Sequence, residues 1–354
     1  GSRDYRVIVN RGLLDRVGAE ASRAAPGVVR WIVVADDTVA ALYGDRVRRS
    51  FAAATDVLTF PAGEAHKTRA TWADLTDRMV ALGAGRDAGV VALGGGVTGD
   101  LAGFVAATYL RGIPVVQVPT SVVAMVDSAV GGKTGVDTAA GKNLVGAFHP
   151  PAVVLVDPTA VATLPRRQRA EGLAEAVKHG AIVDADYARA LERDAEALLD
   201  GDVPAVERMV VRSVEVKADV VSRDEREGGL REILNFGHTL GHALEAASDY
   251  RMSHGEAVAV GMVLEARLGE AVGATRPGTA DELAGILESV GLPTAPPAGL
   301  PRDRVEGFLT TDKKVRKGRP RFVLLAGLGA VDGSGGTWAR PVDELPLARV
   351  LDTA

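Results

Sequence analysis

The chain contains no cysteine, few aromatic residues and no long uninterrupted apolar run. The lack of cysteine excludes disulfides, thiolate nucleophiles and cysteine-ligated zinc, so any metal ion must be held by His, Asp or Glu. Because aromatics make up only 4% of the residues, the core must be built mainly from Ala, Val and Leu. The most apolar stretch, residues 113–126, is interrupted by Pro114, Gln117 and Pro119 and is too short to cross a bilayer. No signal peptide is visible either, and the expectation is a cytoplasmic protein without a membrane partner.

The net charge of −5 argues against a general nucleic-acid partner, which would need a basic surface. It does not exclude a small anionic ligand, because binding of such a ligand depends on local Lys and Arg. At 354 residues, the chain is longer than a single hydrophobic core usually grows, so two domains are expected.

The apolar pattern changes character near residue 165. Before it, short apolar runs alternate with helical patterns, which predicts strands at 5–10, 28–35, 57–60, 88–93, 114–118 and 153–156. After it come long amphipathic runs at 166–181, 184–199, 202–226, 229–247, 253–273 and 279–290. The sequence therefore predicts an α/β nucleotide-binding domain with a parallel sheet at 1–162, followed by an all-α metal-binding domain at 163–354.

A glycine pattern, Gly94-x-Gly96-x-x-Gly99, follows one predicted strand and opens a helix. This context is typical of a dinucleotide site, where the backbone approaches the pyrophosphate at a helix N-terminus. The acidic residue expected about 20 positions later is missing, and Asp36 at the end of an earlier strand is the substitute candidate for the ribose. The alternative is a tight turn that only packs a helix on the sheet.

A second glycine-rich stretch, residues 127–143, contains Lys133, Lys142 and Asn143. Its Gly-Lys-Thr segment resembles the end of a P-loop, but Asp127 stands where that motif needs glycine, so an NTPase is rejected. We expect a glycine-rich loop equipped to bind a phosphate or carboxylate, the alternative being a solvent-facing loop.

Three of the six histidines lie within the stretch from Arg231 to His254. His238 and His242 are four apart and share one helical face, which Gly237 and Gly241 are expected to keep open for a ligand. With His254 at the start of the next helix, this suits a metal held by two imidazoles and a carboxylate from elsewhere. The alternative is a helix with polar residues at its ends.

Glu175 is the candidate for that carboxylate. It lies three residues before Lys178 on one helical face, and the plainer interpretation is a surface ion pair worth little. Further cations lie at Arg111, Lys217, Arg231 and 312–314. Arg231 is expected to open the helix that carries the histidines.

Seven motifs, in the same order, resemble those of the 3-dehydroquinate synthase family, within the sugar phosphate cyclase superfamily. They are Gly-Gly-Gly-x-x-Gly-Asp at 94–100, Val-Asp-Ser-x-Val-Gly-Gly-Lys-Thr-Gly at 126–135, Gly-Lys-Asn at 141–143, Gly-Leu-Ala-Glu-x-x-Lys at 172–178, Leu-Asn-Phe-Gly-His-Thr-x-Gly-His at 234–242, His-Gly-Glu at 254–256 and Asp-Lys-Lys at 312–314. The resemblance extends from about residue 5 to about residue 330 and leaves the tail unassigned.

The resemblance implies a homodimer with bound NAD and one divalent metal ion, zinc or cobalt. It implies the metal ligands Glu175, His238 and His254. The implied NAD-binding residues are Asp36, Glu64, Lys67, Gly95, Gly96, Asp100, Thr120, Ser121, Lys142, Thr163 and Gln168. The implied substrate-binding and catalytic residues are Asp127, Lys133, Lys142, Asn143, Lys178, Lys217, Arg231, Asn235, His242 and Lys313, with Arg111 reaching the site of the neighbouring subunit.

The implied reaction converts 3-deoxy-arabino-heptulosonate 7-phosphate, a small anionic sugar phosphate, to 3-dehydroquinate and phosphate. Transient oxidation by NAD, phosphate elimination, re-reduction and an intramolecular aldol cyclisation follow one another, as a step of the shikimate pathway to aromatic amino acids. Three alternatives stay open. One is a sibling cyclase of secondary metabolism, above all an amino-dehydroquinate synthase. Another is a metal-dependent polyol dehydrogenase, and the last is a non-catalytic protein that retains the fold.

Overall fold

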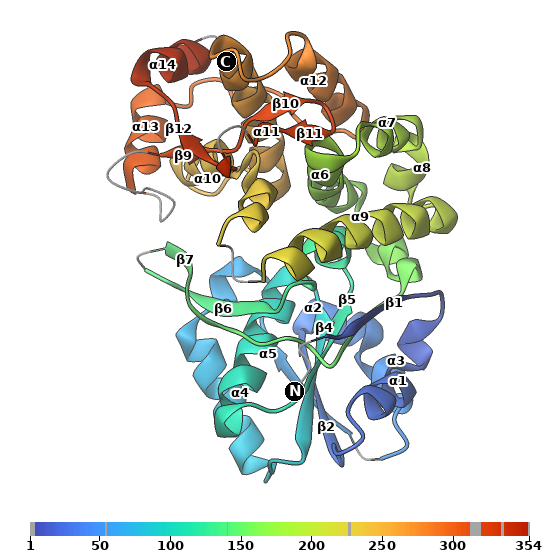
Figure 1. Ribbon diagram of the computed structural model, residues 1–354. Coiled ribbons are helices and arrows are strands. Elements are labelled where there is room, and N and C mark those ends of the chain that lie inside the picture. Colours follow the sequence, from blue (N-terminus) through green and yellow to red (C-terminus); the bar gives the residue numbers. More distant parts are fainter. Residues whose placement is uncertain are drawn as a thin grey trace. The chain divides into compact units, whose positions relative to one another are not determined.

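The computed structural model describes residues 4–53, 55–139, 141–225, 228–311, 320–333 and 336–352. The chain divides into two units, Gly1–Leu164 and Pro165–Ala354 (Figure 1). No helix in these described ranges is long and apolar enough to cross a membrane.

A six-stranded sheet forms the centre of the first unit, in the spatial order β1-β8-β5-β4-β2-β3. Every strand pair in it is parallel, and each strand overlaps one predicted from the sequence. The strands are β1 Arg6–Val9, β2 Arg30–Asp36, β3 Thr55–Phe60, β4 Ala88–Gly94, β5 Val115–Pro119 and β8 Val153–Val156. Strand β4 is buried along its whole length between β2 and β5, which explains its continuous apolar sequence.

Helices and tight turns connect these strands. They are α1 Val17–Ala24, α2 Asp37–Val39, α3 Asp45–Arg49, α4 Arg69–Ala81 and α5 Gly96–Thr108, with short 3₁₀ or π turns at Leu13–Asp15, Ala40–Gly44, Glu64–His66, Tyr109–Arg111, Ala124–Ser128 and Pro158–Thr163. Residues of α4 and α5, among them Leu75 and Leu101, share a buried cluster with Ile32 and Val90 of the sheet. These two helices therefore cover one face of the sheet.

The glycine-rich stretch that follows β5 is a hairpin, and the prediction of a loop was wrong there. Strands β6 Lys133–Thr138 and β7 Gly141–Phe148 pair antiparallel. Gly135 lies opposite Gly146, and a Cβ on Gly146 would be 2.1 Å from the carbonyl oxygen of Thr134. At that position, glycine is needed for close approach of the two strands.

The second unit is largely helical, as predicted. Its helices are α6 Arg166–Val183, α7 Ala185–Arg193, α8 Ala195–Asp200, α9 Val203–Arg223, α10 His238–Ala247, α11 His254–Ala271, α12 Thr279–Ser289, α13 Arg302–Thr311 and α14 Glu344–Asp352. Its short strands β9 Arg321–Phe322, β10 Leu325–Gly327, β11 Ala330–Val331 and β12 Arg340–Pro341 form two small antiparallel pairs. The core contains Leu240 and Leu244 of α10 packed with Val260 and Leu264 of α11.

The predicted helix at 229–247 was wrong in its first part. Residues Leu230–Asn235 form a separate 3₁₀ turn, and α10 begins at His238. Gly237 has a φ of 77°, a left-handed conformation that interrupts the helical path. Arg231 therefore lies on the preceding turn and does not open the helix that carries the histidines.

Candidate functional site

The glycine turn of the first unit joins β4 to α5. A Cβ on Gly95 would lie 3.2 Å from the Ser121 hydroxyl, and one on Gly96 would lie 3.1 Å from that of Ser128. The backbone N–H of Thr120 donates to the carbonyl of Gly94 over 2.9 Å. The structure thus brings Gly95, Gly96, Thr120 and Ser121 to one edge of the sheet, where open α/β folds bind ligands.

Asp36 reaches the same turn from the end of β2. Its carboxylate accepts the backbone N–H of Val39 over 3.0 Å and the hydroxyl of Thr98 over 3.4 Å. The acid that a ribose would need is therefore beside the glycine turn although it comes from an earlier strand.

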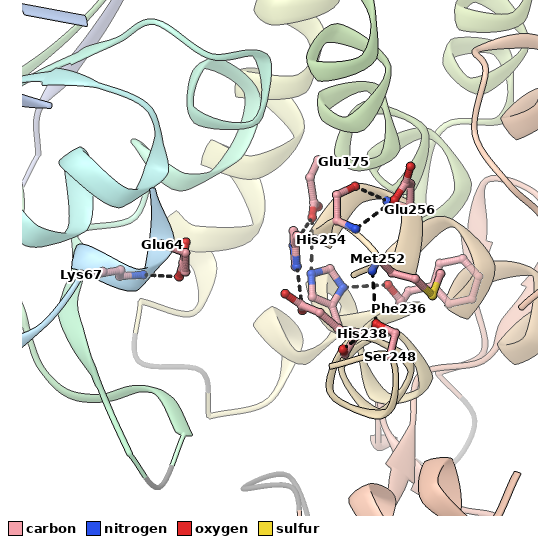
Figure 2. Close-up of polar contacts among 11 residues, drawn as sticks. Glu64, Lys67, Glu175, Phe236, His238, Ser248, Met252, His254 and Glu256 are labelled. Atoms are coloured by element: carbon pink, nitrogen blue, oxygen red, sulfur yellow. Dashed lines mark hydrogen bonds and ion pairs between the residues drawn. The ribbon is translucent and has the colours of Figure 1, made fainter. Parts of the chain in front are cut away.

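Lys67 is at the centre of a second polar group in the first unit. Its buried Nζ lies 2.7 Å from Asp100 and 3.7 Å from Glu64, the pair drawn in Figure 2. Burial lowers the pKa of Lys67, but these carboxylates more than offset it and raise the pKa. Burial also raises the pKa of Asp100 more than Lys67 lowers it. Asp137, which the sequence reasoning missed, donates its backbone N–H to the Lys67 carbonyl over 2.8 Å and so ties the hairpin to this group.

The predicted substrate residues of the first unit lie on or next to the hairpin. Lys133 is exposed on β6, whereas Lys142 is half-buried on β7. Asn143 has a φ of 54°, and its backbone N–H donates to Asp137 over 2.8 Å. Asp127 lies in the π turn before the hairpin.

Three further predicted residues are Arg111, Thr163 and Gln168. Arg111 is exposed and follows Leu110 in a turn where both have positive φ, 69° and 50°. The hydroxyl of Thr163 is 2.8 Å from that of Tyr43, near the end of the first unit. Gln168 belongs to α6 of the second unit, where it is exposed.

A histidine and glutamate cluster lies at the meeting point of α6, α10 and α11. Nε2 of His238 is 3.4 Å from Glu175 Oε1, and Nε2 of His254 is 3.2 Å from the same oxygen (Figure 2). The ring centroids of His238 and His254 are 5.5 Å apart. The structure therefore brings together the three residues predicted as metal ligands.

The spacing of these atoms fits a small divalent cation. Two ligand atoms at zinc bond lengths of about 2.0–2.1 Å from a tetrahedral centre are about 3.3 Å from each other. The separations from Glu175 Oε1, 3.4 Å for His238 Nε2 and 3.2 Å for His254 Nε2, bracket this value. Nδ1 of His238 is 3.1 Å from the carbonyl of Phe236, which fixes the ring with Nε2 toward Glu175.

Electrostatics favour the ionised form of Glu175 but the protonated form of His254. Burial raises the pKa of Glu175, but Lys178 and His238 together hold it well below its usual value. The Lys178 ammonium is 2.5 Å from Glu175, and both side chains are almost fully buried, so the plainer interpretation of a surface pair was wrong. Burial lowers the pKa of His254, yet hydrogen bonds with Glu175 and Glu245 more than offset this and raise it to about 9. Metal uptake would thus displace a proton from that ring.

Other predicted substrate residues of the second unit lie on α9 and on the 3₁₀ turn that follows it. Lys217 is buried on α9 and Arg231 on the 3₁₀ turn. The carboxylate of Asp224 accepts the backbone N–H of Arg231 over 3.0 Å, which holds that turn at the end of α9. Asn235 lies on the same turn and is half-buried. Lys313 lies outside the described residues.

The expectation that two glycines keep the histidine face open was wrong. The ring of His242 is indeed 5.4 Å from that of His238, as the spacing predicted. A Cβ on Gly237, however, would be 2.3 Å from Met262, and one on Gly241 would be 3.1 Å from the backbone of Ala257. The glycines let α10 and α11 approach closely instead of leaving space for a ligand.

Two carboxylates were missed by the sequence reasoning. Glu265 of α11 is fully buried and accepts the backbone N–H of Gly237, Thr239 and Leu240 at the beginning of α10. Glu245 of α10 lies 3.6 Å from Nδ1 of His254. Its position three residues after His242 was the available signal, because that spacing puts both on one helical face.

Two family models match adjoining parts of the chain. Residues 57–171 match the model described as 3-dehydroquinate synthase N-terminal, and residues 172–315 match 3-dehydroquinate synthase C-terminal. The chain belongs to the 3-dehydroquinate synthase family. A 3-dehydroquinate synthase from Symbiobacterium thermophilum is 48% identical over 328 residues, which cover 92% of each chain. The predicted family and function, 3-dehydroquinate synthase of the shikimate pathway, are confirmed by this relative and by others of similar length.

Solved structures of related cyclases share the fold of this synthase family member. A 2-deoxy-scyllo-inosose synthase complexed with carbaglucose-6-phosphate, NAD⁺ and Co²⁺ is 28% identical, with a TM-score of 0.90 over 98% of this chain and 96% of that one. A 2-epi-5-epi-valiolone synthase from Streptomyces hygroscopicus with NAD⁺ and Zn²⁺ bound is 28% identical, with a TM-score of 0.88 over 100% and 97%. Relatives of this fold thus bind the two cofactors that were predicted.

Proposed function

We propose that this synthase acts on 3-deoxy-arabino-heptulosonate 7-phosphate with NAD and one zinc or cobalt ion as cofactors. The convergence of His238 and His254 on Glu175, at separations that suit a tetrahedral cation, carries the proposal. The NAD site would use the glycine turn with Asp36, Thr120 and Ser121, the Glu64–Lys67–Asp100 group, and Lys142, Thr163 and Gln168.

The reaction has no net oxidation. Bound NAD would accept and return one hydride, and a bound divalent cation would polarise substrate oxygens. Oxidation of a ring hydroxyl to a ketone acidifies the neighbouring C–H, so removal of that proton allows the C–O bond to the phosphate to break and phosphate to be eliminated. After reduction of the ketone the ring opens, and an intramolecular aldol addition closes a carbocycle.

The residues of this chain would bind and orient the substrate. Arg231, Lys217, Lys133, Lys142 and Lys313 would bind its anionic groups, and Asp127, Asn143 and Asn235 would contact the substrate elsewhere. A buried guanidinium such as that of Arg231 suits bidentate recognition of a carboxylate. Lys178 and His242 adjoin the proposed metal ligands and would orient substrate oxygens there. Arg111 would contribute to the site of a second subunit of a homodimer.

A phosphate-release assay on the heptulosonate phosphate tests the proposal. We expect one phosphate per turnover without accumulation of NADH, loss of activity with a chelator, and recovery with Zn²⁺ or Co²⁺. Net NADH formation with a glycerol-like polyol would instead indicate a dehydrogenase. Faster turnover of the aminated substrate analogue would indicate an amino-dehydroquinate synthase. Indifference to the chelator, in protein shown to contain no metal, would contradict the metal site.

A further inference from the structure

The imidazole of His254 lies between two buried carboxylates. Its Nε2 is 3.2 Å from Glu175 Oε1, and its Nδ1 is 3.6 Å from Glu245 Oε2. The side chains of Glu175 and Glu245 are only 1% and 7% exposed. The Nε2 side belongs to the proposed metal site, whereas the Nδ1 side contacts a carboxylate that the proposed reaction does not use.

His238 shows the same arrangement with a different acceptor. Its Nε2 also approaches Glu175 Oε1, and its Nδ1 is 3.1 Å from the carbonyl oxygen of Phe236. A histidine that binds a metal through one ring nitrogen carries its proton on the other, and an oxygen acceptor there fixes both the tautomer and the ring orientation. In both rings, an oxygen faces Nδ1 and leaves Nε2 directed at one point.

We propose that Glu245 is a positioning residue, which accepts the Nδ1 proton of His254 and thereby presents Nε2 to the divalent cation. The inference rests on the proposed metal site. Unlike the neutral carbonyl behind His238, Glu245 is a carboxylate, so it also raises the basicity of the ring to which the cation binds. Its place on α10 links the orientation of His254, on α11, to the helix that carries His238.

A competing interpretation makes Glu245 a ligand. His242, Glu245 and His254 each offer an atom within 4.8 Å of the others, so they could hold a cation of their own. Nδ1 of His254 cannot donate a proton to Glu245 and bind a cation at once. Occupation of both positions would require an imidazolate with no proton on either nitrogen. The positioning role needs only the ordinary neutral ring and is therefore favoured.

Cobalt titration of the metal-free protein tests the role of Glu245. The variants are Glu245→Met, which keeps the size but removes the acceptor, and Glu245→Gln, which keeps an acceptor oxygen without the charge. The control is Glu282→Gln, which removes one carboxylate from a partly exposed ion pair with Arg189 on the same unit. The intensity and position of the visible Co²⁺ bands report coordination, competition with Zn²⁺ reports affinity, and circular dichroism reports folding.

We expect Glu245→Met to bind Co²⁺ about 10- to 100-fold more weakly, with altered bands, as for other carboxylates behind metal-binding histidines. Glu245→Gln should recover the wild-type bands and part of the affinity, and the control should match wild type. If Glu245→Met does not fold, affinity below that of the control in Glu245→Gln still supports the role.

Three results would overturn the inference. They are a Glu245→Met variant with wild-type affinity and bands, equal losses in both Glu245 variants, and a wild-type protein that binds two equivalents where Glu245→Met binds one. Failure of the wild-type protein to bind Co²⁺ is a different outcome, because it would refute the proposed metal site itself.

Discussion

Replacement of Glu265 by Gln should destabilise the second unit strongly, even though the change removes only a charge. The carboxylate is fully buried. Oε2 accepts the N–H of Gly237 over 2.8 Å, and Oε1 accepts those of Thr239 and Leu240 over 3.0 and 3.1 Å. These donors have no partner within α10, because the first N–H groups of a helix lack intrahelical acceptors.

The magnitude follows from counting those bonds. An amide keeps only one acceptor oxygen, so in its better orientation the NH₂ group of Glu265→Gln faces the N–H of Gly237. One buried donor then loses its partner at about 1–3 kcal/mol, and two bonds to a charged acceptor become neutral at about 1 kcal/mol each. We expect a loss of about 3–5 kcal/mol.

Amide hydrogen exchange at Gly237, Thr239 and Leu240, together with denaturant unfolding of the second unit, measures this loss. Glu270→Gln on the same helix is the matched control. Glu270 accepts a single backbone N–H, from Ala280 over 2.9 Å, which an amide oxygen can keep, so its cost should stay below about 1 kcal/mol. Equal stability and equal exchange rates in the two variants would refute the assignment of Glu265 as the acceptor that begins α10.

Further predictions concern the metal, the substrate and pH. His254→Ala should lose metal and activity together, measured by metal analysis, and full zinc occupancy in that variant would contradict a ligand role. Arg231→Ala should raise the KM for the substrate strongly and change the Kd for NAD little. Steady-state kinetics measures the KM, and an NAD titration measures the Kd. Backbone N–H groups of Arg231 and Gly228 lower the pKa of Asp224, so its stabilisation should be present above pH 3.8 and lost as pH falls through the lowered pKa. Asp224→Asn should reduce the loss of stability that acid causes in this pH range, as measured by acid unfolding. An unchanged acid-unfolding curve would contradict the stabilising role of Asp224.

The regular part of the α/β unit could be predicted because its central strands β4, β5 and β8 are buried on both faces. A strand such as β4, whose residues are all buried, shows a continuous apolar run that sequence alone reveals. The β6–β7 hairpin gives no such signal, because its residues are Gly, Lys, Thr, Asp and Asn among few apolar ones. Its pairing depends on close backbone approach at Gly135 and Gly146, which has no apolar periodicity.

The histidine and glutamate cluster was predictable for a different reason. The spacing of His238 and His242 and the resemblance of the motifs both pointed to it before any contact was known. The supporting carboxylate Glu265 was not predictable, because it contacts α10 from the next helix and its sequence neighbours are apolar. The beginning of the predicted helix was wrong because at Gly237 a left-handed φ and a carboxylate distant in the sequence decide the conformation.

The close approach of α10 and α11 also limits how this centre can vary. A Cβ on Gly261 would be 2.1 Å from the carbonyl oxygen of Gly237, so the two helices touch through main-chain atoms without a side chain between them. His238 begins α10 and His254 begins α11. The distance between their imidazoles therefore depends on how closely these helices approach, which the absence of side chains at the glycines allows. A methyl group added at one of these glycines would push the two helices apart and change the separation of the imidazoles. Because metal–ligand bond lengths are fixed within narrow limits, we expect such a change to weaken cation binding before it unfolds the protein.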